Sequence, residues 1–132
     1  SSSGVPEARI SAEEILSRVL GRPSFALYAD FELTVNESEL EQFEAFLKKR
    51  ASRYPLQYLV RQIPFRNVRL EVGEGCLIPR PETEILVEMV LRISDITEAN
   101  VLDLGTGSGN IAVSLASERP NWRITATDIS IE

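Results

Sequence analysis

Residues 100–128 constrain the fold of this 132-residue chain more than any other stretch. Residues 101–104 form a short apolar run that ends at glycines, which is typical of a buried strand. The following Gly-Thr-Gly-Ser-Gly can turn tightly and let a ligand approach the backbone. Apolar residues then recur at helical spacing until Pro120. Residues 123–127 complete a predicted strand–loop–helix–strand unit, with Asp128 at the carboxyl end of the second strand.

This unit predicts half of a nucleotide-type site, in which the acid after the second strand takes ribose hydroxyls. A dinucleotide-binding loop has the spacing Gly-x-Gly-x-x-Gly, but here the third glycine comes one residue early and Asp103 precedes the first by two residues. Pyrophosphate requires a helix N-terminus without a nearby anion, whereas S-adenosylmethionine has no phosphate and carries an ammonium and a sulfonium. The pattern Asp-x-Gly-x-Gly-x-Gly resembles motif I of the class I S-adenosylmethionine-dependent methyltransferases. An NAD-type site and a turn without any ligand are the alternatives.

Composition excludes several classes of function. The formal net charge of -6 argues against broad, sequence-independent binding of nucleic acid. The chain has no histidine, which excludes histidine triads, histidine metal sites and imidazole acid–base chemistry. The single cysteine, Cys76, cannot form an internal disulfide, and we expect it to be a small buried hydrophobe. No apolar run approaches the length of a membrane span and no signal peptide is visible, so we expect a cytoplasmic protein.

The chain is expected to have three parts: an N-terminal helical domain (1–54), a connecting segment with a β-hairpin (55–75) and the start of an α/β domain (76–132). The hairpin is predicted from apolar residues that alternate with polar ones. In the first part, Asn36 and Glu39 have the spacing of a capping box at the start of a long helix. Four residues of that helix are expected to face a core, and a later helix is expected to bury one stripe. The first set is Leu40, Phe43, Phe46 and Leu47, and the stripe is Leu86, Met89, Val90 and Ile93.

A cluster of cations lies at the end of the long helix, where positive charge is favourable to the helix dipole. It has two interpretations: a solvated helix end, or a docking patch for an acidic or RNA-containing partner. The cluster comprises Lys48, Lys49, Arg50 and Arg53.

The order of the motifs is more specific than any one of them. A small helical domain is followed by Pro-Leu-Gln-Tyr from residue 55, Ile-Pro-Arg-Pro-Glu-Thr-Glu from residue 78 and Asp-Leu-Gly-Thr-Gly-Ser-Gly from residue 103. This order resembles the N-terminal part of the HemK/PrmC family of protein-(glutamine-N5) methyltransferases, which modify peptide chain release factors. The resemblance extends over nearly the whole chain, and its most specific element is the string from residue 78. Motif I alone would identify only the superfamily.

The resemblance implies a small N-terminal helical domain followed by the first part of a class I, Rossmann-like methyltransferase domain. It implies S-adenosyl-L-methionine as the cofactor, with Asp128 on the ribose hydroxyls and Asp103 beside the methionine end. Residues 80–84 would border the same cavity. The N-terminal helices would dock a release factor, so that its Gly-Gly-Gln loop enters the α/β domain. The cofactor loop would be formed by Gly105, Thr106, Gly107, Ser108 and Gly109.

The family's catalytic motif, Asn-Pro-Pro-Tyr after the fourth strand of the sheet, does not occur in these 132 residues. The resemblance therefore assigns no catalytic residue here and implies an inactive fragment of a longer enzyme. A methyltransferase for another protein or for a nucleic-acid amine, and a non-catalytic module that binds release factors, are the alternatives. The chain also departs from the family at two positions, Arg61 and Arg66, where the family commonly has glycine.

Overall fold

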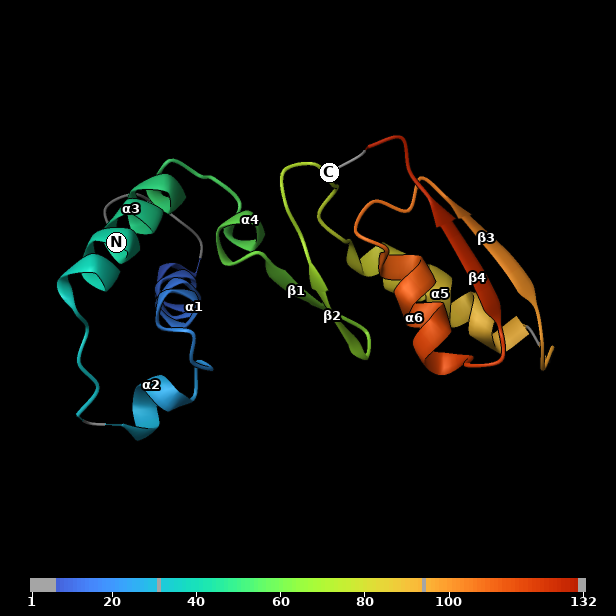
Figure 1. Ribbon diagram of the computed structural model, residues 1–132, viewed down its shortest axis with the longest axis horizontal. Helices are drawn as coiled ribbons and strands as arrows, with labels where there is room; N and C mark the ends of the chain where they lie inside the picture. Colours follow the sequence, from blue (N-terminus) through green and yellow to red (C-terminus); the bar gives the residue numbers. More distant parts are fainter. Residues whose placement is uncertain (1–6, 31, 94, 131–132) are drawn as a thin grey trace. The chain divides into compact units, whose positions relative to one another are not determined.

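The computed structural model of the chain describes residues 7–30, 32–93 and 95–130 (Figure 1). The chain divides into two compact units, Ser1–Val60 and Arg61–Glu132. The described part of the first unit is helical and that of the second combines strands with helices, which confirms the predicted order of a helical part and an α/β part. The boundaries predicted after residues 54 and 75 stay predictions. No helix within the described ranges is long and apolar enough to span a membrane.

Local sequence signals mark two of the helix ends in the first unit. Its helices are α1 (Ala8–Leu20), α2 (Ala26–Ala29), α3 (Glu37–Ala51) and α4 (Leu56–Val60). At the end of α1, Gly21 adopts a left-handed φ of 62° that closes the helix. At the start of α3, the Glu39 N–H donates to the Asn36 side chain at 2.9 Å and the Glu39 carboxylate accepts from the Asn36 N–H at 2.8 Å. The predicted capping box is thereby confirmed.

The core of the first unit lies where α1, α3 and α4 meet. Its buried residues are Ile15, Leu59 and Val60, with Phe43, Phe46 and Leu47 packed against them. The expectation that Leu40 faces this core is wrong, because its side chain is 49% exposed. It lies in the first turn of α3, ahead of the residues that pack against α1 and α4.

The basic cluster at the end of α3 is partly engaged within the unit. The Arg50 guanidinium donates to Ser11 Oγ at 3.2 Å and to the Tyr54 carbonyl at 3.2 Å, and thus ties α3 to α1. Lys49 lies over the ring of Tyr54, 5.9 Å from its centroid. These contacts give two of the four cations a structural role, and a docking role for the cluster stays a prediction.

The second unit contains a hairpin and a parallel pair of strands. The hairpin pairs β1 (Gln62–Phe65) with β2 (Val68–Glu71), as the alternation of apolar residues predicts. After α5 (Pro81–Ile93), β3 (Asn100–Leu104) pairs in parallel with β4 (Arg123–Thr127), and α6 (Asn110–Glu118) connects the two strands. The predicted strand–loop–helix–strand unit is confirmed. The core between these elements consists of Phe65, Leu70, Val87, Leu91, Leu115 and Trp122.

Two expectations about burial in this unit are wrong. On α5 the buried residues are Val87 and Leu91 and the predicted Val90 packs against the core, whereas Leu86 and Met89 are 48% and 56% exposed. The side chain of Ile93 lies outside the described part. The strand β3 is half-buried on one side and exposed on the other, because the core packs against Val101 and Ile124 on one face of the β3–β4 pair and described elements leave the other face uncovered (Figure 1). In consequence Leu102 and Leu104 are 59% and 73% exposed.

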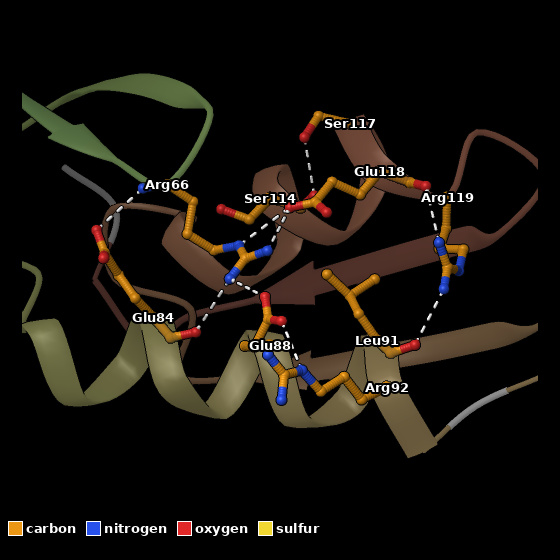
Figure 2. Close-up of polar contacts among 9 residues, drawn as sticks. All are labelled: Arg66, Glu84, Glu88, Leu91, Arg92, Ser114, Ser117, Glu118 and Arg119. Carbon is orange, nitrogen blue, oxygen red and sulfur yellow. Dashed lines mark hydrogen bonds and ion pairs between the residues drawn. The ribbon is translucent and has the colours of Figure 1, made fainter.

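Arg66 explains the rotation of α5. Its side chain points from the hairpin turn into the space between α5 and α6 (Figure 2). The guanidinium donates to Glu118 Oε1 at 2.8 and 3.0 Å and to Glu88 Oε2 at 2.9 Å. The Arg66 N–H donates to Glu84 Oε1 at 3.0 Å. Because Glu84 and Glu88 share one face of α5, these contacts fix the neighbouring face, with Val87 and Leu91, toward the core.

The two departures from the family pattern both fall on left-handed backbone. Arg61 has a φ of 58° and Arg66 has a φ of 48°. Glycine adopts such a conformation without strain, and another residue loses about 1 kcal/mol. The hairpin forms nonetheless. At Arg66, whose side chain is only 14% exposed, the ion pairs with Glu88 and Glu118 offset the strain.

Replacement of Arg66 should separate the strain from the ion pairs. We expect Arg66→Ala to lower the free energy of unfolding by about 2 kcal/mol, because it removes both ion pairs and keeps the left-handed residue. Arg66→Gly should be more stable than Arg66→Ala by about 1 kcal/mol, because glycine relieves the strain. Urea unfolding followed by circular dichroism measures both differences.

The control is Arg69→Ala, since Arg69 is exposed on β2 of the same hairpin. It should change stability by less than about 0.5 kcal/mol. Equal stability of Arg66→Ala and the unchanged chain would contradict the role given to the ion pairs.

Candidate functional site

The loop between β3 and α6 turns at three left-handed glycines. Gly105, Gly107 and Gly109 have φ values of 73°, 55° and 75°. A Cβ atom at Gly109 would also lie 3.4 Å from a methyl carbon of Val113, whereas one at Gly105 would meet nothing within 4 Å. The backbone conformation, more than crowding, therefore requires glycine, as the sequence predicts.

Backbone hydrogen bonds fasten this loop to the end of β4. The N–H groups of Gly105 and Thr106 both donate to the Thr127 carbonyl, at 2.8 and 3.0 Å. The Gly109 N–H donates to the Thr106 carbonyl at 2.9 Å. The Thr106 hydroxyl donates to Asp103 Oδ2 at 2.7 Å, which orients the half-buried Asp103 carboxylate.

The exposed carboxylate of Asp128 completes the connection. Asp128 Oδ2 accepts from the Gly107 N–H at 2.7 Å, and Oδ1 accepts from the Ser130 N–H at 2.9 Å. The bonds from Ser130 and Gly107 lower the pKa of Asp128 below its ordinary value, because they stabilise the ionised form. The structure thus joins Asp103, Thr106, Gly107 and Asp128 in one network, and their role toward a ligand stays a prediction.

This arrangement is poorly suited to a pyrophosphate. Four N–H groups of the loop, those of Gly105, Thr106, Gly107 and Gly109, already donate to oxygens of the chain. Two carboxylates flank the loop, and they would repel an anion. An uncharged or cationic ligand with hydroxyls for Asp128 fits better. The observation favours a ligand of the S-adenosylmethionine type over the NAD-type alternative.

A hollow of about 370 Å³ adjoins the loop on the side of Gly107 and Ser108. Its opposite wall comes from the segment after β2, where Cys76 Cβ lies 3.9 Å from the position that a Cβ of Gly107 would occupy. Cys76 is half-buried there, so the expectation of a buried hydrophobe is only partly met. The lining residues are Arg61, Glu71, Val72, Gly73, Glu74, Gly75, Cys76, Gly107 and Ser108.

Sequence reasoning missed most of this hollow. The charged residues Arg61, Glu71 and Glu74 were not expected near the glycine loop, and the signal that could have indicated the wall is the Gly-Glu-Gly-Cys turn after β2. Residues 80–84, implied to border the cavity, do not line the hollow. Glu84 instead accepts the Arg66 N–H at 3.0 Å, on the hairpin side of α5.

The lowered pKa of Asp128 gives a pH dependence. In a titration by NMR, the Gly107 amide shift should follow Asp128 with a midpoint below 3.8. Because the pKa is lower in the folded than in the unfolded chain, the stability that these hydrogen bonds supply is present above pH 3.8 and is lost as the pH falls through the folded pKa.

Asp128→Asn is the control, since it should remove this titration and leave the left-handed turn in place. A midpoint at or above 3.8 would contradict the stabilisation of the carboxylate by the loop.

Comparison with known proteins identifies two domains. Residues 1–60 match the PrmC N-terminal domain, and residues 81–132 match the methyltransferase small domain. The second match covers α5, the glycine loop and Asp128.

Curated relatives named release factor glutamine methyltransferase match the chain across both domains. The relative from Leptospira interrogans is 44% identical over 130 residues, which cover 97% of this chain and 46% of the relative. The one from Coxiella burnetii is 41% identical over 123 residues, or 92% of this chain and 44% of the relative. The one from Streptococcus pneumoniae is 48% identical over 96 residues, or 73% of this chain and 34% of the relative.

The chain spans about half the length of the curated relatives it matches. The order of the two domains and the extent of these matches agree with the order of motifs in the sequence. The chain therefore combines a PrmC N-terminal domain with a methyltransferase small domain, and it is a homologue of proteins named release factor glutamine methyltransferase.

Proposed function

We propose that this chain carries the release-factor-recognition and methyl-donor-binding parts of an S-adenosylmethionine-dependent methyltransferase. The full enzyme would methylate N5 of the glutamine in the Gly-Gly-Gln motif of a peptide chain release factor, a step that serves translation termination. The observation that carries the proposal is the left-handed glycine loop between two carboxylates, Asp103 and Asp128, in a chain that matches the PrmC N-terminal domain.

The second unit would hold the donor by its own loop and acids. Asp128 would accept hydrogen bonds from the ribose hydroxyls, since its carboxylate is exposed and stays ionised. The loop 105–109 would let the donor approach the backbone, and Asp103, oriented by Thr106, would lie toward the cationic amino-acid end. When bound, the donor would supply an electrophilic methyl group on its sulfonium.

The chemistry that remains is the positioning of the glutamine. An amide nitrogen is a poor nucleophile because its lone pair is delocalised, so catalysis would consist mainly of orientation and electrostatic stabilisation. The family's Asn-Pro-Pro-Tyr motif supplies the acceptors for the amide, and these 132 residues contain no such segment. We accordingly propose that they bind the donor and the release factor without transferring a methyl group.

Two alternatives remain for the substrate. A nucleic-acid amine is disfavoured by the net charge of -6, because a phosphate backbone would be repelled. A module that binds release factors and no donor would leave the Asp103–Asp128 network without a function beyond folding.

Isothermal titration with S-adenosylmethionine tests the donor site. We expect the 132-residue chain to bind it, and Asp128→Ala to weaken binding by at least about tenfold, because hydrogen bonds to a charged carboxylate are lost. Asp95→Ala, which removes another exposed aspartate of the same unit, should bind as the unchanged chain does. Binding that is insensitive to Asp128 would contradict the assigned ribose contact, and no binding by any variant would leave a recognition module.

Titration with a purified release factor tests the substrate. We expect the chain to bind the release factor and not a single-stranded RNA of matched charge. Mass spectrometry should find no methyl group added to the release factor by the chain alone. Tight binding of RNA without binding of the release factor would favour the nucleic-acid alternative.

A further inference from the structure

The hollow beside the glycine loop contains one guanidinium among its lining residues, that of Arg61. It comes from the position just before β1, while Gly107 and Ser108 belong to the loop after β3. The hairpin places them on one hollow, although more than forty residues separate them in the sequence. Asp128 does not line this hollow, so Arg61 faces a part of the site distinct from the proposed ribose contact.

Folding does not account for Arg61. Its φ of 58° is unfavourable for any residue except glycine. The only side-chain partner that the described structure gives it is Glu71, with Arg61 Nε 3.8 Å from Glu71 Oε1. Both side chains are well exposed, at 59% and 76%, so this ion pair contributes little to stability. The backbone is held by its carbonyl, which accepts the Val72 N–H at 3.1 Å, and this contact would survive replacement by glycine.

Arg66, by contrast, has a structural reason for its left-handed backbone. Arg66 has the same left-handed backbone, but its side chain is only 14% exposed and its guanidinium pairs with Glu88 and Glu118. Its ion pairs offset the strain within the fold. Arg61 lacks that compensation among the described residues, and strained residues without a structural reason are concentrated at binding sites.

The charges that line the hollow alternate in sign. Arg61 is cationic, and Glu71 and Glu74 are anionic. The amino-acid end of S-adenosylmethionine carries an ammonium, a carboxylate and a sulfonium, which is the complementary set. A volume of about 370 Å³ suits a small group rather than a folded protein surface.

We propose that Arg61 binds the α-carboxylate of the methyl donor in this hollow. The ammonium and sulfonium would lie in the negative field of Glu71 and Glu74, and Gly107 would separate this end from the ribose at Asp128. The guanidinium suits the carboxylate because its N–H groups match two oxygens in one plane. This inference rests on the proposed function and adds a specificity residue to it.

The proposal is tested by removing the carboxylate from S-adenosylmethionine and, separately, the positive charge from Arg61. The unchanged chain, Arg61→Gln and the control Arg69→Gln are titrated with S-adenosylmethionine, decarboxylated S-adenosylmethionine and 5′-methylthioadenosine. Arg61→Gln should lower the affinity for S-adenosylmethionine about tenfold, as expected for the loss of one charge-assisted contact. It should change the affinity for each of the other two ligands less than about twofold. Arg69→Gln should change none of them, because Arg69 does not line the hollow.

A second readout is independent of the affinity. Amide shifts of Gly107 and Ser108 should respond to S-adenosylmethionine in the unchanged chain and respond less in Arg61→Gln. Arg61→Gly should raise the melting temperature, since it relieves the strain of the left-handed backbone. It should lower the affinity for S-adenosylmethionine as much as Arg61→Gln does. This variant shows that a loss of binding does not come from a loss of folding.

The other outcomes overturn the inference in distinguishable ways. If Arg61→Gln weakens all three ligands equally, Arg61 does not recognise the carboxylate. If it leaves S-adenosylmethionine unchanged but abolishes binding of the release factor, Arg61 binds an acidic side chain of the protein substrate, and the inference fails while the proposed function stands. If the unchanged chain binds none of the three ligands, the proposed donor site fails together with it.

Discussion

The guanidinium of Arg66 is the interaction on which the second unit depends. It lies between two helices and contacts carboxylates from both, Glu88 on α5 and Glu118 on α6, while its own backbone forms the hairpin turn (Figure 2). A single side chain thus fixes three elements that are remote in sequence. Because charge-assisted hydrogen bonds are directional, they select one rotation of α5, and this rotation decides which apolar residues reach the core.

The proposed donor site also depends on the contacts that Arg66 makes with α5 and α6, because the glycine loop leads directly into α6. With α6 fixed against α5 by Arg66, the loop that begins α6 is held at one end by the helix and at the other by β3. The bonds to the Thr127 carbonyl and to Asp128 then close the loop onto β4. Such a loop needs little reorganisation when a ligand arrives, which reduces the entropic cost of binding.

The features that the sequence predicts well are those set by neighbouring residues. The capping box of Asn36 and Glu39, the end of α1 at Gly21 and the left-handed turns of the glycine loop each follow from a few adjacent side chains or from the absence of one. The pairing of β3 with β4 follows equally from a short loop–helix connection. No distant partner is needed to determine any of them.

The features that could not be predicted are decided by partners far along the chain. Periodicity gives α5 an apolar stripe, but Leu86 and Val87 are equally apolar, and only the acids that face Arg66 select Val87 as the buried one. Similarly, residues 101–104 have the composition of a buried strand, while the burial of Leu102 depends on a layer that described elements do not supply. The hollow was missed because its two walls are joined only by the fold.

Arg61 and Arg66 share a left-handed backbone, but the contacts of their side chains point to different roles. A left-handed backbone destabilises an arginine locally, and an interaction within the chain or with a bound ligand can offset that strain. Arg66 is stabilised within the chain, where its largely buried side chain pairs with Glu88 and Glu118. Arg61 has an exposed partner at 3.8 Å and a position on the wall of a charged hollow next to the glycine loop. In the proposed site, the loop backbone and Asp128 would serve the adenosine end, which has few charges, whereas Asp103 and the hollow would serve the amino-acid end, which carries them.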